Sequence, residues 1–360
     1  MKRILVWGLS NNRAGTEKVI ETYCSSLPDI HFDFLCYEYP ENYVHLLHGK
    51  DCKATVIPIK IKHPVANCIE LRKFSRSHVG YYDALWFNVN DFSNIDLLIE
   101  ASNTMRIPRR IVHMHNAGIP NIMITKVFSR LNYDKVIRLG TEFWACSKAA
   151  GEYAFPTIPY AVVPNLVDDT KFAYSQANRL EIRTRHAIQD STFVVGSTGR
   201  LAPQKNYSFL IRAFAKFHTD TPDSLLLLVG EGDLLELLQQ QTKELGVQNA
   251  VIFAGQQPDV EKYYSAFDVF ALTSLYEGLS VSAIEAQFNG LPCVLSAGVP
   301  REALITTSSV FISTDESDSW VKAFANATRK NVKLTAHADL FRISNLKEIA
   351  ESLFEYQVSN

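Results

Sequence analysis

The sequence predicts an α/β protein built from two doubly wound domains in tandem. Short apolar runs alternate with helix-length segments from the first residues onward, which is the pattern of parallel βαβ units. The same alternation restarts near residue 192. The chain has 360 residues, and single hydrophobic cores rarely grow much past about 250–300 residues. Two sheets, each with its own core, are therefore expected.

The first series opens on a buried-strand signal at residues 4–8 and a polar loop. A helix is predicted over residues 17–27, with Thr16 as its N-cap. Further strands are predicted at residues 32–37, 54–59, 84–87, 110–115, 142–146 and 161–164. The polar stretch 168–178 has no clear periodicity and is interpreted as the linker.

The second series repeats the pattern with stronger apolar runs. Its predicted strands are residues 192–197, 225–229, 251–254, 269–273 and 293–296. Its predicted helices are residues 208–218, 234–245, 259–266 and 281–289. The apolar residues of 339–356 follow helical spacing and predict a C-terminal helix.

Composition and charge argue against several classes of partner, metal site and cellular location. The net charge of −2 creates no field that demands a nucleic-acid partner. Six cysteines form no C-x-x-C pair and no zinc-ligand spacing, so a reduced, cytoplasmic setting is expected. The first apolar run is too short for a signal peptide. No run reaches the ~20 apolar residues of a membrane span, so any membrane attachment is expected to be peripheral.

The loop of residues 199–206 carries a candidate anion site. It follows a predicted strand and precedes a predicted helix, and it holds Arg200 and Lys205 five residues apart. Arginine grips phosphate oxygens bidentately, and lysine acts as a point charge. The alternative is a solvated loop with two surface cations.

The segment of residues 277–285 is the second candidate. The helix expected from Val281 offers free N–H groups and a positive dipole end to sugar hydroxyls or phosphate. Glu277 can accept hydrogen bonds from sugar hydroxyls, and Glu285 from both hydroxyls of a ribose. The alternatives are structural: Ser282 and Glu285 fit a capping box, and Glu277 fits a surface loop.

Together the two segments resemble family 4 of the retaining glycosyltransferases, which have the GT-B fold. Residues 199–206 match its G-R-x4-K-N loop, and residues 277–286 match E-G-x6-E-A. The first half is similar more loosely, through residues 14–17, 113–116, 146–148 and 164–168. Ala14 and Leu166 stand where the family usually has glycine.

The resemblance implies roles for the second-half residues. Arg200 and Lys205 would neutralise the diphosphate and stabilise it as the leaving group. Glu277 would hold the donor sugar, and Glu285 the ribose of the nucleotide. The backbone expected to line the sugar is that of Gly278, Leu279, Ser280 and Val281.

In the first half, the resemblance implies roles for Gly15 and His115. Gly15 would let its loop approach the phosphate without a side chain, and His115 would hydrogen-bond a sugar hydroxyl near the anomeric carbon. His113 and His115 lie two apart on a strand and share a face. They form either a metal pair without a clear third ligand, or an active-site His115 above a packed His113. No D-x-D motif occurs, and no metal requirement is expected.

The resemblance also implies a division of labour. Residues 1–167 are expected to form an acceptor-binding Rossmann-like domain, and residues 168–335 a nucleotide-sugar donor-binding one. Residues 336–360 are expected to form a helix that packs back on the first domain. The expected reaction moves a hexose or N-acetylhexosamine from a UDP-sugar to a saccharide or lipid-linked saccharide acceptor, in capsule or exopolysaccharide synthesis.

Other functions compete with this one. A dinucleotide-dependent oxidoreductase is disfavoured because no G-x-G-x-x-G lies between Gly8 and Gly15. A phosphorylase of the same fold is disfavoured because the sequence lacks the lysine context that its cofactor needs. A sugar epimerase of this fold, and an inactive GT-B subunit that scaffolds a partner transferase, stay open. Residues 120–131 mix apolar and basic side chains, which indicates either an anionic membrane surface or a helix packed on the core. The expected location is the cytoplasm, with peripheral attachment to the inner membrane face as an option.

Overall fold

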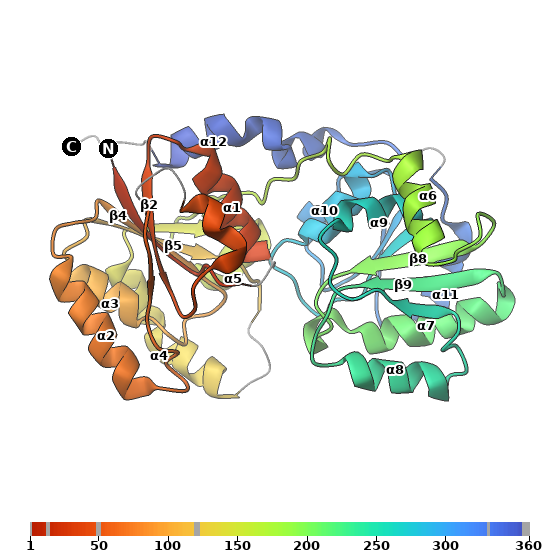
Figure 1. The fold of residues 1–360 in the computed structure, drawn as a ribbon, viewed down its shortest axis with the longest axis horizontal. Coiled ribbons are helices and arrows are strands. Elements are labelled where there is room, and N and C mark those ends of the chain that lie inside the picture. Colours follow the sequence, from red (N-terminus) through yellow and green to blue (C-terminus); the bar gives the residue numbers. More distant parts are fainter. Residues whose placement is uncertain (1, 12–14, 48–51, 119–122, 330–331, 355–360) are drawn as a thin grey trace. The chain divides into compact units, whose positions relative to one another are not determined.

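The structure is a computed structural model that describes residues 2–11, 15–47, 52–118, 123–329 and 332–354. The chain divides into two compact units. Unit 1 is Met1–Leu166 with Ser344–Asn360, and unit 2 is Val167–Ile343. Each unit has one parallel sheet with helices on its faces (Figure 1). The prediction of two doubly wound α/β domains is confirmed.

The sheet of unit 1 has the strand order β3-β2-β1-β4-β5-β6-β7, and all its pairings are parallel. From β1 the chain proceeds outward through β2 and β3, and then restarts at β4 on the other side. The switch point therefore lies between β1 and β4. The strands are β1 (Arg3–Trp7), β2 (His31–Cys36), β3 (Ala54–Val56), β4 (Ala84–Val89), β5 (Arg109–Met114), β6 (Glu142–Ala145) and β7 (Ala161–Val162).

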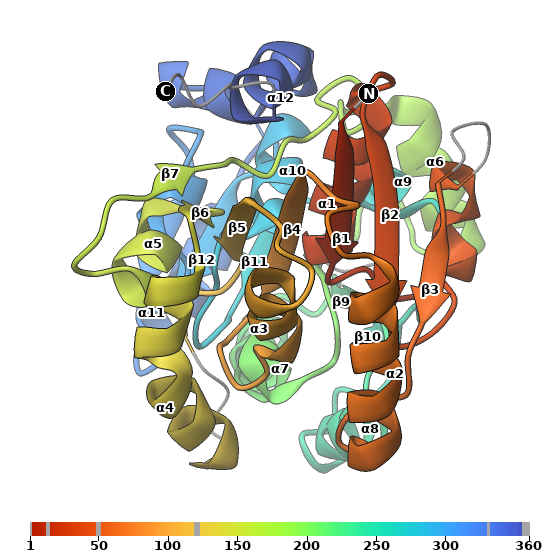
Figure 2. The ribbon, with the colours of Figure 1, turned by 90° about the vertical axis from the view of Figure 1, so that its left-hand side faces the viewer.

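Helices cover the sheet of unit 1 on both faces. Their bounds are α1 (Gly15–Ser26), η1 (Glu41–Leu46), α2 (Pro64–Ser77), α3 (Asp96–Asn103), α4 (Met123–Leu139), α5 (Lys148–Ala154) and α12 (Leu346–Phe354). Helix α3 contacts both α2 and α4, and α1 contacts α12; Figure 2 views this unit from the side of α2, α3 and α4. The Phe354 ring of α12 lies 5.1 Å from the Trp86 ring and 5.3 Å from the Trp144 ring, edge to face. The C-terminal helix thus completes the core of unit 1.

The sheet of unit 2 has the order β10-β9-β8-β11-β12-β13, again with parallel pairings. Its switch point lies between β8 and β11. The strands are β8 (Phe193–Thr198), β9 (Ser224–Val229), β10 (Val251–Phe253), β11 (Val269–Leu272), β12 (Cys293–Ser296) and β13 (Val310–Ile312). Strand β13 is absent from the sequence-based prediction, because three residues that remain partly exposed give little apolar signal.

The helices of unit 2 include two that the sequence did not predict, α6 and α11. Their bounds are α6 (Gln176–Arg185), η2 (Pro203–Lys205), α7 (Tyr207–Asp220), α8 (Leu235–Glu244), α9 (Val260–Ala266), α10 (Val281–Phe288), η3 (Arg301–Ala303), α11 (Ser317–Asn326), η4 (Ala336–Phe341) and η5 (Ile343–Asn345). Helix α6 begins inside the predicted linker, where the Ser175 hydroxyl accepts from the Asn178 N–H.

Three predictions are corrected. Of the predicted helix 339–356, which the structure describes as far as Phe354, only α12 is α-helical, and the part before it forms the short 3-10 helices η4 and η5. Backbone bonds hold η4 in unit 2, because Val167 N–H donates to the Phe341 carbonyl at 2.8 Å. The chain therefore returns to unit 1 at Ser344 and not at residue 336. Thr16 is not an N-cap, since α1 already includes Gly15.

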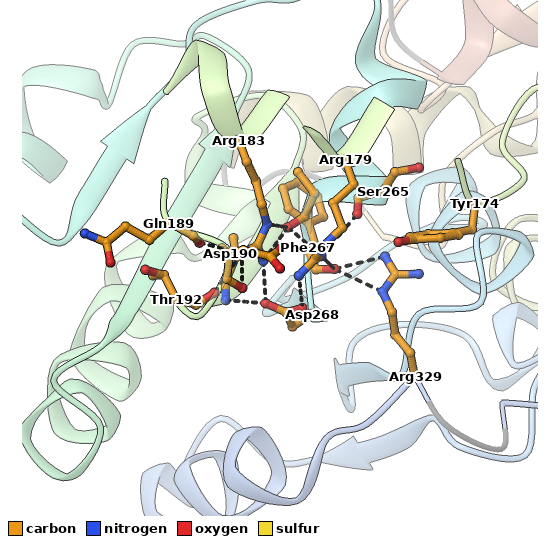
Figure 3. Close-up of polar contacts among 12 residues, drawn as sticks. Tyr174, Arg179, Arg183, Gln189, Asp190, Thr192, Ser265, Phe267, Asp268 and Arg329 are labelled. Atoms are coloured by element: carbon orange, nitrogen blue, oxygen red, sulfur yellow. Dashed lines mark hydrogen bonds and ion pairs between the residues drawn. The ribbon is translucent and has the colours of Figure 1, made fainter. Parts of the chain in front are cut away.

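A buried arginine network fastens α6 to the sheet of unit 2 (Figure 3). Arg183 is only 3% exposed and pairs with Asp268 at 2.8 Å. Arg179 pairs with the other oxygen of Asp268 at 3.0 Å. The Val194 N–H donates to the same carboxylate at 2.7 Å. Arg329 donates to the Phe267 and Tyr264 carbonyls beside it.

Candidate functional site

The two segments singled out as a donor site lie at the switch point of unit 2. The loop of residues 199–206 follows β8, and the loop of residues 273–280 follows β11. These strands are neighbours in the sheet, so their carboxyl ends open side by side. In open α/β sheets this is the place where ligands bind.

Hydrogen bonds lace the two loops together. The Thr273 hydroxyl donates to the Lys205 carbonyl at 2.9 Å, and Leu275 N–H donates to the Gln204 carbonyl at 2.8 Å. The Gln204 amide donates to the Tyr276 carbonyl at 2.9 Å. Both loops are thus fixed by backbone acceptors, and their side chains are held in one place.

Lys205 and Glu277 meet across the two loops. Lys205 Nζ lies 2.6 Å from Glu277 Oε1, and the Ser274 hydroxyl donates to that same oxygen at 2.6 Å. The two side chains are 17% and 9% exposed. Both side chains are largely buried, so the interpretation of Lys205 and Glu277 as solvated charges on surface loops is wrong.

Arg200 differs from Lys205 because its side chain is exposed. It follows Gly199 directly after β8. In the part of the chain that the structure describes, no ion pair involves its guanidinium. Its charge is therefore available at the mouth of the sheet, whereas that of Lys205 is already paired with a carboxylate.

Glu285 lies on the second turn of α10 and is 6% exposed. Its Oε2 accepts from the Tyr264 hydroxyl at 2.7 Å, and the Thr198 and Tyr264 hydroxyls lie 2.8 Å apart. Burial and this carboxylate raise the pKa of Tyr264 well above its usual range. The capping-box interpretation is wrong: the N-cap is Ser280, it makes no side-chain capping bond, and Ser282 is inside the helix.

The backbone predicted to line a sugar leads into α10. Gly278, Leu279 and Ser280 are buried, and Val281 is half-buried as the first residue of the helix. The start of α10 therefore points its first N–H groups at the same switch point, and no side-chain cap from Ser280 competes for them. A dipole end without a cap favours a negative or hydroxyl-rich ligand.

A pocket of about 410 Å³ opens next to these loops, and no role was predicted for its residues. The turns after β9 and β10 and the start of α8 line it, with Glu231, Asp233 and Gln239 as its polar members. Leu201 N–H donates to the Glu231 carbonyl at 2.8 Å, which ties the pocket to the loop after β8. Its volume falls in the range of small-molecule sites.

Gly230 explains how these turns approach so closely. Its φ is +138°, and a Cβ there would lie 2.1 Å from the Gly199 carbonyl oxygen. Any side chain would push the loop after β8 away from the turn after β9. The glycine spacing after β9, Gly230 and Gly232, was the sequence signal that could have pointed to this pocket.

In unit 1, His115 directly follows β5 at the carboxyl edge of the sheet. Its backbone N–H donates to the Val89 carbonyl at 2.9 Å, and its ring Nε2 lies 2.8 Å from Asn88 Oδ1. His113 is fully buried, and its Nδ1 accepts from the Trp86 indole at 3.2 Å. Burial lowers the pKa of His115 to about 3 and that of His113 well below its usual value.

The metal-pair alternative for the two histidines finds no third ligand among the described residues. Their rings lie 4.0 Å apart, and each uses one ring nitrogen in a hydrogen bond, His115 Nε2 and His113 Nδ1. Across the described residues, no three His, Cys, Asp or Glu side chains are placed to hold a metal ion.

Gly15 is the first residue of α1 and is exposed. A Cβ there would meet no atom of the described protein within 4 Å, so packing does not require glycine at this position. Ala14 lies outside the described residues. Leu166, the other departure from the family pattern, is buried in the core of unit 1.

Helix α4 carries an exposed apolar face. Five large side chains on its first turns are 47–77% exposed, and the buried residues of this helix are Ser129 and Val136. The same helix also contacts α3, and its buried Ser129 hydroxyl accepts from the Phe92 N–H at 3.2 Å, so both alternatives for this stretch stay open; residues 120–122 lie outside the described residues. The five exposed apolar side chains of α4 are Met123, Ile124, Val127, Phe128 and Leu131.

Among the described residues, none of the helices has the length and apolar character needed to span a bilayer.

Several known proteins are similar to this chain. Residues 178–338 match the family Glycosyl transferases group 1. The Bacillus subtilis (strain 168) protein named glycosyltransferase EpsF is 26% identical over 91% of this chain and 88% of its own length. An Escherichia coli relative, named UDP-Gal:alpha-D-GlcNAc-diphosphoundecaprenol alpha-1,3-galactosyltransferase, is 31% identical over 48% of this chain and 46% of its own length. The chain thus covers about half of the length of this second relative.

The fold has solved counterparts. The structure of Anabaena Alr3699/HepE in complex with UDP and glucose superposes with a TM-score of 0.76, at 19% identity, over 99% of this chain and 100% of that one. This likeness concerns the fold, which is GT-B, as the sequence predicted.

Proposed function

We propose that this chain, a glycosyltransferase with the GT-B fold, transfers a hexose or N-acetylhexosamine from a nucleotide sugar to a saccharide acceptor. The observation that carries the proposal is the pairing of two loops at one switch point, with Arg200 and Lys205 on one and Glu277 on the other. Cations at this place stabilise a diphosphate leaving group, and a carboxylate beside them accepts from sugar hydroxyls.

The nucleotide is proposed to bind next to these two loops, in the pocket after β9 and β10 and at Glu285. The pocket after β9 and β10 takes the base, and Glu285 takes the ribose hydroxyls while Tyr264 fixes its carboxylate. The diphosphate then lies between the pocket and the start of α10. Uridine is the proposed base, because the HepE complex contains UDP and the E. coli relative is named for UDP-Gal.

The sugar is proposed to bind beside Glu277, with the backbone of Gly278–Val281 lining it. A hydrogen bond between a sugar hydroxyl and His115, which the sequence resemblance implies, is also part of the proposal. Retention of the anomeric configuration is part of this proposal, and no covalent sugar–enzyme intermediate is included. A proton NMR time course on the first-formed product distinguishes a retained from an inverted anomer.

A panel of nucleotide sugars tests the donor. Each compound is added to the purified chain and its effect on thermal unfolding is recorded. A ligand at 100 times its Kd stabilises a protein by about 2.7 kcal/mol, so the true donor should stand out. Stabilisation by GDP-mannose and not by any UDP-sugar would overturn uridine. Stabilisation by no nucleotide sugar would overturn the donor site.

Catalysis without a metal is also proposed. Arg200 and Lys205 supply the positive charge that a divalent ion supplies in metal-dependent transferases. Turnover should therefore be unchanged in excess chelator. Complete loss with recovery on added manganese would contradict this.

The acceptor is proposed to be lipid-linked, in the synthesis of capsule or exopolysaccharide. The exposed apolar face of α4 supports this, since Lys126, Arg130, Lys135 and Arg138 lie on the same helix and such a mixture suits an anionic membrane surface. Co-sedimentation with liposomes should require anionic lipid and weaken with salt. The variant Phe128→Asp should reduce it, and Leu237→Asp, on the exposed face of α8, is the matched control.

An inactive scaffold subunit is the competing function. The paired Lys205 and Glu277 favour an enzyme, because a scaffold has no use for a buried ion pair at a ligand site. Transfer or hydrolysis of a labelled nucleotide sugar by the purified chain separates the two.

A further inference from the structure

Asn88, at the carboxyl end of β4, makes three hydrogen bonds that together fix its orientation. It is 2% exposed. Its side-chain nitrogen donates to the Trp7 carbonyl at 3.0 Å and to the Trp86 carbonyl at 3.3 Å. Both partners are acceptors only, so the atom facing them must be the NH₂ group. The other atom, Oδ1, is therefore the one that faces His115 at 2.8 Å.

This orientation determines the proton position on His115. Oδ1 can only accept, so His115 Nε2 must carry a hydrogen and donate it. Burial lowers the pKa of His115 to about 3, so the ring is neutral near pH 7 and holds one proton. Nδ1 is then left as a bare acceptor. It is buried and has no hydrogen-bond partner among the described residues.

Backbone packing leaves Asn88 little freedom to move. Gly8 follows β1 with φ +108°, and a Cβ there would lie 2.8 Å from both the Cβ and the carbonyl oxygen of Asn88. Only glycine permits β1 and β4 to hold the asparagine this close to the Trp7 carbonyl. The switch point of unit 1 is thus built around the Asn88 amide.

We infer that Asn88 is the positioning residue of His115: its amide oxygen selects the tautomer with Nε2 protonated, so that Nδ1 is presented as an acceptor for a hydroxyl of the bound sugar. A buried acceptor without a partner is unfavourable, and a hydroxyl donor would supply that partner on binding. The histidine then prefers a neutral hydroxyl ligand over a phosphate, because Nδ1 has no hydrogen to donate. This inference rests on the proposed role of His115 in sugar transfer.

The wild-type protein gives the first test. Ring 15N shifts of His115, assigned by their loss in His115→Gln, report which nitrogen carries the hydrogen. A pyrrole-type Nε2 and a pyridine-type Nδ1 are expected in the free protein at pH 7.5. A pyrrole-type Nδ1 would overturn the inference, and this reading needs no substrate. Addition of the nucleotide sugar should then shift Nδ1, whereas the nucleoside diphosphate alone should not; equal shifts with both would overturn the sugar as the ligand of Nδ1.

Asn88→Leu tests the positioning. It should mix the two His115 tautomers and lower kcat by about 10–100-fold, the usual effect of losing an orienting partner, with KM for the donor little changed. Asn67→Leu is the matched control, because Asn67 is also 2% exposed and its amide donates to the Pro58 carbonyl. It should leave the tautomer and kcat unchanged. Should Asn88→Leu not fold, Asn88→Ser replaces it, and an unmixed tautomer in either variant contradicts the inference.

Failure of the inference and failure of the proposed function give different results. A locked tautomer in a protein that transfers no sugar would leave the role of Asn88 in holding His115 intact and remove the transferase proposal. Sugar transfer by a protein in which His115 Nδ1 is pyrrole-type would support the transferase proposal and remove the role of Asn88.

Discussion

Lys205 Nζ and Glu277 Oε1 lie 2.6 Å apart, joined across the loops that follow β8 and β11. In the proposed function, Lys205 is thus already paired with a carboxylate when the diphosphate binds. An ammonium has three donors, so Lys205 can keep this contact and still donate to a phosphate oxygen. Glu277 is held in one orientation by Lys205 and by the Ser274 hydroxyl.

Lys205→Met is expected to lower kcat/KM for transfer by about 10²–10³-fold, the effect of removing one electrostatic donor from a transition state. It should also reduce the free energy of unfolding by about 1–3 kcal/mol, because Glu277 loses its partner in a buried place. Steady-state transfer kinetics and urea unfolding measure the two effects.

Lys216→Met is the control for that variant. Lys216 is exposed and pairs with Asp318, whose side chain is 84% exposed. Such a surface pair contributes little, so turnover and stability should both stay near the wild type. A Lys205→Met enzyme with wild-type kcat/KM would remove Lys205 from the transfer step.

Glu285→Ala is expected to weaken donor binding by about tenfold or more, since one charge-assisted hydrogen bond contributes about 1.5–3 kcal/mol. The Tyr264 hydroxyl loses one partner but keeps Thr198, so the fold should survive. Calorimetric titration with the nucleoside diphosphate measures the loss. Tyr264→Phe is the companion variant: it keeps the carboxylate but removes the hydroxyl that donates to its Oε2, and it should bind the nucleotide less tightly than wild type and more tightly than Glu285→Ala. Unchanged nucleotide affinity in Glu285→Ala would make that glutamate purely structural.

Some contacts of the candidate site could be predicted from the sequence, and others could not. Arg200, Lys205, Glu277 and Glu285 stand on segments that follow predicted strands. Their spacing alone left a solvated loop and a capping box open, and the family resemblance supplied the prediction that they form one donor site. The hydrogen bond between Tyr264 and Glu285 was not predicted. Tyr264 lies on α9, and an aromatic residue there is expected to belong to the hydrophobic core.

Asn88 was missed for a related reason. A lone asparagine at the end of a strand carries no motif, and its role appears only when β1, β4 and β5 lie side by side. The helix at α6 was missed because it is polar, and its stability comes from Arg179 and Arg183, whose carboxylate partner lies more than eighty residues later.

The stability of unit 1 should depend on pH through His115. Its pKa is lowered to about 3 in the folded protein, from about 6.5 in an unfolded chain. Between these values the unfolded state binds the extra proton, so acid favours unfolding. The contribution of His115 to stability is therefore complete above pH 6.5 and is lost as the pH falls towards 3, at up to about 1.4 kcal/mol per pH unit.

His115→Gln isolates this effect, since glutamine does not titrate and His113, the ring 4.0 Å away, is present in both proteins. Urea unfolding followed by tryptophan fluorescence, with Trp86 and Trp144 in the core of this unit, gives the free energies at pH 7 and 5.5. The stability gap between the two proteins should shift by about 1 kcal/mol in favour of His115→Gln at the lower pH. A gap that does not change would mean that His115 already titrates normally in the fold.

Asp268 joins Arg179, Arg183 and the Val194 N–H through one carboxylate (Figure 3). Asp268→Asn keeps the shape but removes the charge, so Arg183 remains buried without a counter-ion. Breaking a buried pair in this way costs about 3 kcal/mol or more, and α6 should loosen from β8 and β11 before the rest of unit 2 unfolds.

Amide hydrogen exchange provides the measurement. In Asp268→Asn, protection should fall first in α6 and at Val194, while the amides of α7, on a different part of the unit, keep theirs at low denaturant. Asp318→Asn is the control, because its ion pair is exposed and its loss should change unfolding by no more than about 0.5 kcal/mol. Since Asp268 lies at the start of β11 and the Lys205–Glu277 pair at its far end, nucleotide affinity at low temperature should be retained in Asp268→Asn. A parallel loss of affinity and of α6 protection would mean that the donor loops depend on the arginine network, and that the two ends of the sheet are coupled.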